Sequence, residues 1–212
     1  MNFIETIRLE GGRFHLLELH QQRLAATLRE VYGGSVCVPD IEAALGSLCD
    51  IPDTGIYKCR IVYDTDIREI ELLPYSPRTV KTLKAVEADA SLDYHLKSCD
   101  RTALSALAEQ KGNCDEVIII RNGLVTDTSY TNLVFHSNDR LYTPRLPLLK
   151  GVMRQHLLTE GLLTEGLLTE ADIRREDLVE GNRFGITGVS LINAMLPLEY
   201  APVIPIGIRI AS

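Results

Sequence analysis

The stretch DEVIIIRNGLVTDTSYTNLVFHSNDRLYTP, residues 115–144, decides the fold class. It contains apolar, β-branched runs, and two short turn dipeptides interrupt them, Asn122-Gly123 and Asn138-Asp139. Such dipeptides between apolar runs are strong signals for tight turns that join antiparallel strands. Residues 115–144 are therefore predicted to form two successive β-hairpins.

The chain before this stretch alternates between strand and helix patterns. Residues 3–19 read as two strands around Gly11-Gly12, and residues 18–34 as a helix that Gly33-Gly34 ends. The remaining expected elements are a short helix at 40–50, a hairpin over 55–75, a strand at 82–86 and a helix at 101–113. This mixture predicts an α+β protein with antiparallel strands in its first part.

The chain after this stretch is predicted to contain a helix that opens with GVMRQHLL (151–158) and a buried strand in GVSLINAMLPL (188–198). Between them, LLTEG repeats with a period of five, which fits no helix or coiled coil. The repeat is either a tandem duplication that lengthens the link between helix and strand, or a helix end joined to a loop. We expect two domains, a small N-terminal α+β domain (1–85) and a larger C-terminal domain (86–212).

Composition narrows the classes of function. The 212 residues are 45% hydrophobic and carry a net charge of −7, which argues against a general nucleic-acid binder. Five irregularly spaced cysteines without a CxxC pair indicate reduced thiols in a cytoplasmic protein. The five histidines do not cluster with the cysteines, so no zinc site is predicted. We find neither a signal-peptide pattern nor an apolar run long enough to span a membrane.

Lys97, in LDYHLKSCDRTAL (92–104), is the first candidate for chemistry. The apolar residues around it could line one buried face near the start of a helix; they are Leu92, Leu96, Ala103 and Leu104. Lysines usually extend to water, whereas an amine held against apolar surface has a lowered pKa and can act as a nucleophile. The sequence alone leaves both interpretations of Lys97 open.

Several other polar residues fall where elements are expected to begin or end: Arg23, Arg60, Arg101, Asp127 and the helix start at Lys150–Met153. Taken singly, each has an ordinary structural explanation as a solvated arginine, a turn residue or a helix cap. Taken together, an amine, an isolated acid, arginines and a helix N-terminus are the groups needed to hold a phosphorylated pyridine aldehyde.

Longer motifs strengthen this hypothesis. The chain resembles the class IV aminotransferase family of fold-type IV pyridoxal-phosphate enzymes from about Phe3 to Pro197. The resemblance rests on HxxRL at 20–24, GxVT[acid]xxxxN at 123–132, LKSCDR at 96–101, YTPRL at 142–146, GVMRQ at 151–155 and INAMLPL at 192–198. Within the family the last four motifs are most similar to the 4-amino-4-deoxychorismate lyases. The resemblance implies a small N-terminal α/β unit and a larger, barrel-like C-terminal α/β unit.

The resemblance also implies roles for individual residues. Lys97 would bind the aldehyde of pyridoxal 5′-phosphate as a Schiff base, and Asp127, where the family usually has glutamate, would face the pyridine nitrogen. The cofactor phosphate would be held by Arg23 and by backbone N–H groups at Val152, Met153, Asn193 and Ala194. Arg60 and Arg101 would be candidates for binding substrate carboxylates.

Three interpretations of function follow. The preferred one is a lyase that releases pyruvate and p-aminobenzoate for folate synthesis. The second is an aminotransferase acting on branched-chain or D-amino acids, and the third is a non-catalytic member that only binds the cofactor. We expect a small-molecule amine substrate and a homodimer, with no nucleic-acid or membrane partner.

Overall fold

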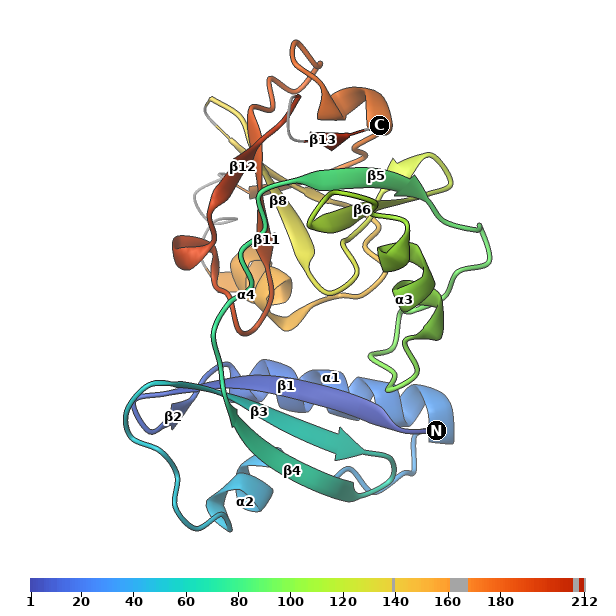
Figure 1. Ribbon diagram of the computed structural model, residues 1–212. Coiled ribbons are helices and arrows are strands. Elements are labelled where there is room, and N and C mark those ends of the chain that lie inside the picture. The colour runs from blue at the N-terminus through green and yellow to red at the C-terminus, as the bar shows by residue number, and fades with distance from the viewer. Residues whose placement is uncertain (139, 161–167, 208–209, 212) are drawn as a thin grey trace. The chain divides into compact units, whose positions relative to one another are not determined.

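The computed structural model describes residues 1–138, 140–160, 168–207 and 210–211. The chain divides into two compact units. The first comprises Met1–Pro77 with Leu96–Asp100, and the second comprises Arg78–His95 with Arg101–Ser212. Each unit contains both sheets and helices, which confirms the predicted α+β class (Figure 1).

The first unit is built on an antiparallel sheet in the order β2-β1-β3-β4. Its strands are β1 (Phe3–Glu10), β2 (Arg13–Phe14), β3 (Ile56–Tyr63) and β4 (Ile67–Pro74). The β1–β2 turn places Gly11 at φ 56° and Gly12 at φ 71°. Two successive positive φ values suit glycine, so the predicted hairpin around Gly11-Gly12 is confirmed.

Two helices cover one face of this sheet, α1 (Leu17–Tyr32) and α2 (Ile41–Gly46). Leu24 and Leu28 of α1 are fully buried one turn apart, which explains why the apolar stripe folds as a helix. Both leucines belong to one hydrophobic core, which α1, α2, β1 and β3 form together. The other buried members of this core are Phe3, Ile7, Ile41, Leu45, Cys59, Ile61 and Tyr63.

The second unit contains two sheets around one shared core. The first has the order β13-β5-β6-β7 and the second the order β10-β9-β8-β11-β12. Their strands are β5 (Leu83–Glu87), β6 (Glu116–Arg121), β7 (Leu124–Val125), β8 (Asn132–His136), β9 (Leu141–Pro144), β10 (Leu168–Ala171), β11 (Gly188–Ile192), β12 (Val203–Pro205) and β13 (Ile210–Ala211). Ile118 and Ile120 from one sheet meet Leu133, Phe135 and Val189 from the other in one cluster. This arrangement agrees with the barrel-like unit expected of the fold.

Both hairpins predicted in residues 115–144 are present. β6 and β7 pair antiparallel, and the turn between them has φ 54° at Asn122 and φ 76° at Gly123. β8 and β9 also pair antiparallel, and Ser137 N donates to Arg140 O across their turn at 2.9 Å. Asp139, the second residue of that predicted turn, lies outside the described residues.

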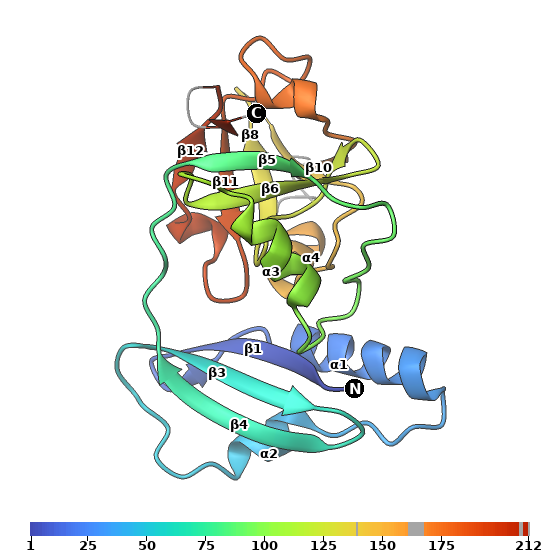
Figure 2. The same ribbon diagram turned by 45° about the vertical axis from the view of Figure 1, so that its right-hand side comes forward.

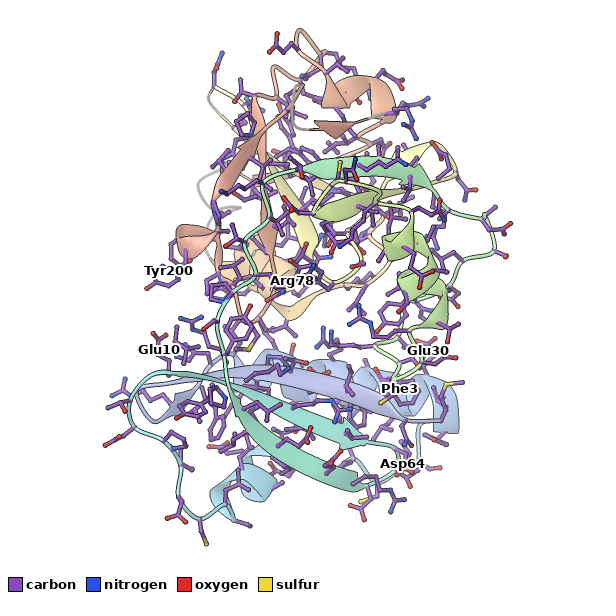
Figure 3. All side chains as sticks on the ribbon, in the orientation of Figure 1. Phe3, Glu10, Glu30, Asp64, Arg78 and Tyr200 are labelled. Atoms are coloured by element: carbon purple, nitrogen blue, oxygen red, sulfur yellow. The ribbon has the colours of Figure 1, made fainter. Side chains whose placement is uncertain are left out.

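The helices of the second unit are α3 (Thr102–Glu109), which packs on the β5–β6 sheet (Figure 2), and α4 (Val152–Glu160). The second unit also contains two short 3-10 helices, η1 (Arg175–Leu178) and η2 (Leu198–Tyr200). Tyr200, the last residue of η2, is 64% exposed (Figure 3). The first LLTE of the pentapeptide repeat ends α4, and Leu168–Ala171 form β10. Residues 161–167 of the repeat lie outside the described residues, so both interpretations of that link stay open.

The division into units differs from the predicted boundary after residue 85 in two places. β5 pairs in parallel with β6, so residues 78–95 group with the second unit. Residues 96–100 return to the first unit, because Ile4 N donates to Lys97 O at 3.0 Å and Cys99 N donates to Asn2 O at 2.9 Å. Both differences come from long-range strand pairing, which local sequence patterns do not encode.

We expect Ile61→Ala to lower the free energy of unfolding by about 2–5 kcal/mol, because it leaves a cavity in the core between β3 and the helices. Ile61 is 0% exposed, whereas Leu73 in the neighbouring strand β4 is 41% exposed. Leu73→Ala is therefore the matched control, with an expected change under about 1 kcal/mol. Urea unfolding followed by circular dichroism measures both; equal losses would contradict this account of the core.

Candidate functional site

The residues singled out from the sequence fall in both units. Lys97, Arg23 and Arg60 belong to the first unit. The second unit contains the rest, namely Arg101, Asp127, Val152, Met153, Asn193 and Ala194. Each group has its own set of hydrogen bonds and ion pairs within its unit.

Arg23 of α1 forms an ion pair with a buried carboxylate, Glu5 of β1. Arg23 Nε donates to Glu5 Oε1 at 2.8 Å and Nη2 donates to Oε2 at 2.5 Å. His20, three residues earlier on α1, contacts the same Oε2 through Nδ1 at 2.5 Å. Positions three apart share one face of a helix, so the HxxR spacing brings both side chains to Glu5.

The charges of this cluster follow from burial and pairing. Burial alone would raise the pKa of Glu5, but the Arg23 charge and the His20 hydrogen bond outweigh it and lower the pKa to about 2. Burial lowers the pKa of His20, so the neutral ring donates from Nδ1 to the ionised Glu5. His20 Nε2 is buried and has no hydrogen-bond partner among the described residues.

Sequence reasoning missed Glu5, although a signal was present. In β1, Glu5 alternates in step with Phe3, Ile7 and Leu9, and all four are 0% exposed. A charged residue on the apolar face of a strand indicates a buried charge, which requires a partner.

Lys97 lies in a short irregular segment that bonds to β1 rather than at a helix edge. Its carbonyl accepts from Ile4 N, the next residue forms a bridge with Phe3, and α3 begins only at Thr102. The expected apolar face around Lys97 is wrong, since Leu96 joins the core of the first unit, Leu104 packs in the second and Ala103 is exposed. Lys97 itself is half-buried, and its charge contributes to lowering the pKa of His20.

Arg60 has two carboxylate partners on the neighbouring strand. Its Nη1 lies 3.0 Å from Glu71 and 3.2 Å from Glu69, both on β4. Two glutamates around one guanidinium leave this group of three with a net negative charge. This arrangement gives little support for binding a substrate carboxylate at Arg60.

Asp127 follows β7 and is 4% exposed. Its Oδ1 accepts from Asn132 Nδ2 at 2.7 Å, and its Oδ2 accepts from Leu149 N at 3.0 Å. Burial raises the pKa of Asp127 to about 6, although these N–H donors oppose the increase. Each carboxylate oxygen can accept a second hydrogen bond, so Asp127 retains capacity for a further donor.

Val152 and Met153 are the first residues of α4, and both are buried. The first backbone N–H groups of a helix have no carbonyl partners within it and attract anions. Asn193 follows β11, where its Oδ1 accepts from Met195 N at 2.8 Å and from Leu196 N at 3.0 Å. These bonds shape a tight turn that includes Ala194.

Arg101 precedes the first residue of α3, and its Nη2 donates to Ser129 O at 2.6 Å. This bond anchors Arg101 to the loop between Asp127 and Asn132. The structure therefore brings Arg101 near the Asp127 loop within the second unit.

Comparison with known proteins assigns this chain to a protein family. The model of the amino-transferase class IV family matches residues 2–192. This chain belongs to the class IV aminotransferase family. An uncharacterised protein from Haemophilus influenzae is 36% identical over 194 residues, covering 90% of this chain and 96% of that protein.

Solved structures share the class IV aminotransferase fold. A candidate 4-amino-4-deoxychorismate lyase from Haemophilus somnus 129PT has a TM-score of 0.82 and 34% identity, with 93% of this chain and 97% of that chain covered. A hypothetical aminotransferase from Mycobacterium tuberculosis, in its PLP-bound form, has a TM-score of 0.71 and 19% identity, with 96% and 80% covered.

Among the described residues, no group of three or more His, Cys, Asp or Glu side chains could hold a metal ion. No helix in the described part of the chain is both long and apolar enough to cross a membrane.

Glu5→Gln should lower the free energy of unfolding by about 3–5 kcal/mol at pH 7, because Arg23 would keep a buried charge without its counter-charge. The pKa of Glu5 falls from its usual 4.5 to about 2 on folding, so its stabilising effect is complete above about 4.5. The difference between wild type and variant should therefore shrink as the pH falls from 4.5 toward 2.

Glu10→Gln is the control for that experiment. Glu10 pairs with Arg8 on the same strand, but its side chain is 42% exposed. Exposed pairs contribute less than about 1 kcal/mol, so this variant should unfold almost like wild type. Urea unfolding at several pH values measures both variants, and a pH-independent loss in Glu5→Gln would contradict the assigned ionisation.

Proposed function

We propose that this protein is a pyridoxal 5′-phosphate-dependent 4-amino-4-deoxychorismate lyase, which releases pyruvate and p-aminobenzoate. The observation that carries the proposal is the 34% identity to the candidate lyase from Haemophilus somnus 129PT, over 93% of this chain. The LKSCDR, YTPRL, GVMRQ and INAMLPL motifs support the same choice within the family.

The chemistry of the second unit suits pyridoxal phosphate. Asp127 offers a buried carboxylate with capacity for one more donor, which matches a protonated pyridine nitrogen. The start of α4 at Val152 and Met153, and Ala194 N in the turn after β11, offer backbone N–H groups suited to a phosphate. Asn193 N, which the resemblance also assigned to the phosphate, instead donates to Leu196 O at 3.2 Å. In the first unit, Arg23 would supply a guanidinium for the same phosphate, and Glu5 would hold its orientation.

Lys97 is the residue proposed to bind the cofactor aldehyde and then to move the proton. When bound, pyridoxal phosphate supplies an electron sink for the bond-breaking step. The Lys97 amine takes the proton from the ring carbon that bears the substrate's amino group. The C–O bond to the enolpyruvyl group then breaks, and the substrate ring becomes aromatic. Enolpyruvate leaves as an enolate, and protonation of its methylene carbon, for which the proton taken up by Lys97 is available, gives pyruvate.

Asp127 would bind the pyridine nitrogen through its ionised carboxylate and would thereby stabilise negative charge that develops in this step. The substrate carries two carboxylates, for which Arg101 and Arg60 are the proposed partners. Arg101 has the stronger support, because it is anchored beside the Asp127 loop, whereas Arg60 already pairs with Glu69 and Glu71.

An aminotransferase acting on branched-chain or D-amino acids is the second candidate. It is favoured by the family itself and by a shared fold with hypothetical aminotransferases. The same lysine would move a proton between two carbons instead of promoting loss of enolpyruvate.

We also propose that the protein is a cytoplasmic homodimer. Light scattering on the purified protein measures its mass in solution and so tests the dimer.

Reduction with borohydride in the presence of pyridoxal phosphate should attach the cofactor to Lys97, one of six lysines in the chain. Peptide mapping identifies the labelled residue. Lys97→Ala should remove the label, whereas Lys150→Ala should retain it, although Lys150 lies close to α4 in the sequence. A label found mainly on Lys58 or Lys150 would overturn the assignment.

Incubation with enzymatically prepared aminodeoxychorismate should yield p-aminobenzoate and pyruvate. Arg101→Ala should raise KM about tenfold or more, because a charged hydrogen bond to a carboxylate contributes roughly 1.5–3 kcal/mol. Arg60→Ala should have the smaller effect. The contrary result is a wild-type protein that forms no p-aminobenzoate yet transfers the amino group of a branched-chain or D-amino acid.

A further inference from the structure

Asn132 links two parts of the second unit that the proposed function uses separately. Its Nδ2 donates both to Asp127 Oδ1, at 2.7 Å, and to Leu149 O, at 2.9 Å. Leu149 N donates to Asp127 Oδ2 at 3.0 Å, which closes a ring of three hydrogen bonds. Asp127 precedes β8, and Leu149 lies three residues before α4. One side-chain amide therefore ties the carboxylate to the segment that leads into the helix.

The loop between Asp127 and Asn132 holds Asn132 in this position. Thr128 N donates to Thr131 O at 2.9 Å, and Thr131 N donates to Thr128 Oγ1 at 2.9 Å. Both threonines are buried. The loop is thus closed on itself, and it returns the chain so that the residue five positions after Asp127 faces it.

Asn132 also contacts the residue immediately before α4. A Cβ added to Gly151 would lie 1.9 Å from Asn132 Oδ1, far inside any real contact. Asn132 therefore packs directly on the Gly151 backbone, and a larger residue at 151 would displace either Asn132 or the start of α4.

We propose that Asn132 is a positioning residue that sets the spacing between the Asp127 carboxylate and the N-terminus of α4. The proposal rests on the proposed function, because that spacing matters when one ligand molecule must reach both groups. A ligand with a ring nitrogen and a phosphate gains affinity from simultaneous binding only when the two sites are held at a matching distance. The family motif contains this asparagine, and the ring of hydrogen bonds gives it a role.

Pyridoxamine 5′-phosphate is the suitable probe, because it has no aldehyde and its binding does not depend on a covalent bond to Lys97. Equilibrium titration should show that Asn132→Ala raises its dissociation constant roughly tenfold or more. Inorganic phosphate, measured as a competitor, tests the helix N-terminus alone and should change by less than about threefold. A positioning role predicts this split, whereas simple loss of the helix start predicts equal losses.

Asn182→Ala is the matched control. Asn182 also donates twice from Nδ2, to Val179 O and Ile186 O, both at 2.9 Å, but it takes no part in the Asp127 ring. This variant should lose thermal stability yet bind pyridoxamine phosphate like wild type. Circular dichroism establishes that each variant is folded before binding is measured.

Gly151→Ala tests the same contact from the other side and serves if Asn132→Ala does not fold. Its added Cβ meets Asn132, so it should weaken pyridoxamine phosphate binding, while Gly46→Ala, where a Cβ would meet nothing within 4 Å, should not. In the Asn132→Ala background the clash is gone, and Gly151→Ala should cost little more. Losses that multiply in the double variant would show two independent effects and overturn the proposal.

The pH profile of binding gives an independent readout. The hydrogen bond from Asn132 lowers the pKa of Asp127, so its removal should raise that pKa above about 6. Affinity falls when Asp127 becomes protonated, and in Asn132→Ala this fall should begin at a higher pH than in wild type or Asn182→Ala. Unchanged affinity and pH profile would overturn the proposal. If wild type itself binds no pyridoxamine phosphate, the proposed function fails and the proposal with it.

Discussion

The second unit depends on how a buried carboxylate, Asp127, is stabilised without a charged partner bound to it. Its oxygens accept from the Asn132 amide and from the Leu149 backbone. A carboxylate removed from water must be compensated, and neutral N–H donors do so only when the chain holds them in place. The Thr128–Thr131 loop, the Leu149 segment and the glycine before α4 are all arranged around this requirement.

The buried carboxylate of the first unit, Glu5, is stabilised in a different way. Glu5 is equally buried, but it pairs with the Arg23 guanidinium as well as with neutral His20. The opposite pKa shifts follow from this difference, since a nearby cation lowers the pKa of Glu5, whereas burial prevails at Asp127 and raises it. Glu5 is therefore ionised near neutral pH, whereas the protonation of Asp127 depends on the hydrogen-bond donors close to it. This difference suits Glu5 to hold an arginine in place and Asp127 to bind a ligand that donates a hydrogen bond to it.

Much of the local structure could be predicted from short patterns. The Asn122-Gly123 and Gly11-Gly12 turns, the end of α1 at Gly33 and the fully buried strand β11 all appear where the sequence indicates. These features depend on backbone conformation and side-chain periodicity over a few residues. The site was less predictable, because Glu5 and Asn132 act through contacts between distant segments. Lys97 shows the limit most clearly: its segment belongs to the first unit because it bonds to β1, and its own sequence does not indicate this.

The sequence by itself determined the α+β class, most element positions and the family, since these rest on periodicity, turn residues and motif order. Tertiary structure decided the assignment of residues 78–95 and 96–100 to their units and the partners of each buried charge. The tripeptide Leu-Thr-Glu illustrates why local sequence is insufficient, because it ends helix α4 at 158–160 and lies within strand β10 at 168–170. The third copy of the repeat becomes a strand by pairing in parallel with β9. Weak local preferences yield to long-range hydrogen bonding and burial, which only the folded chain supplies.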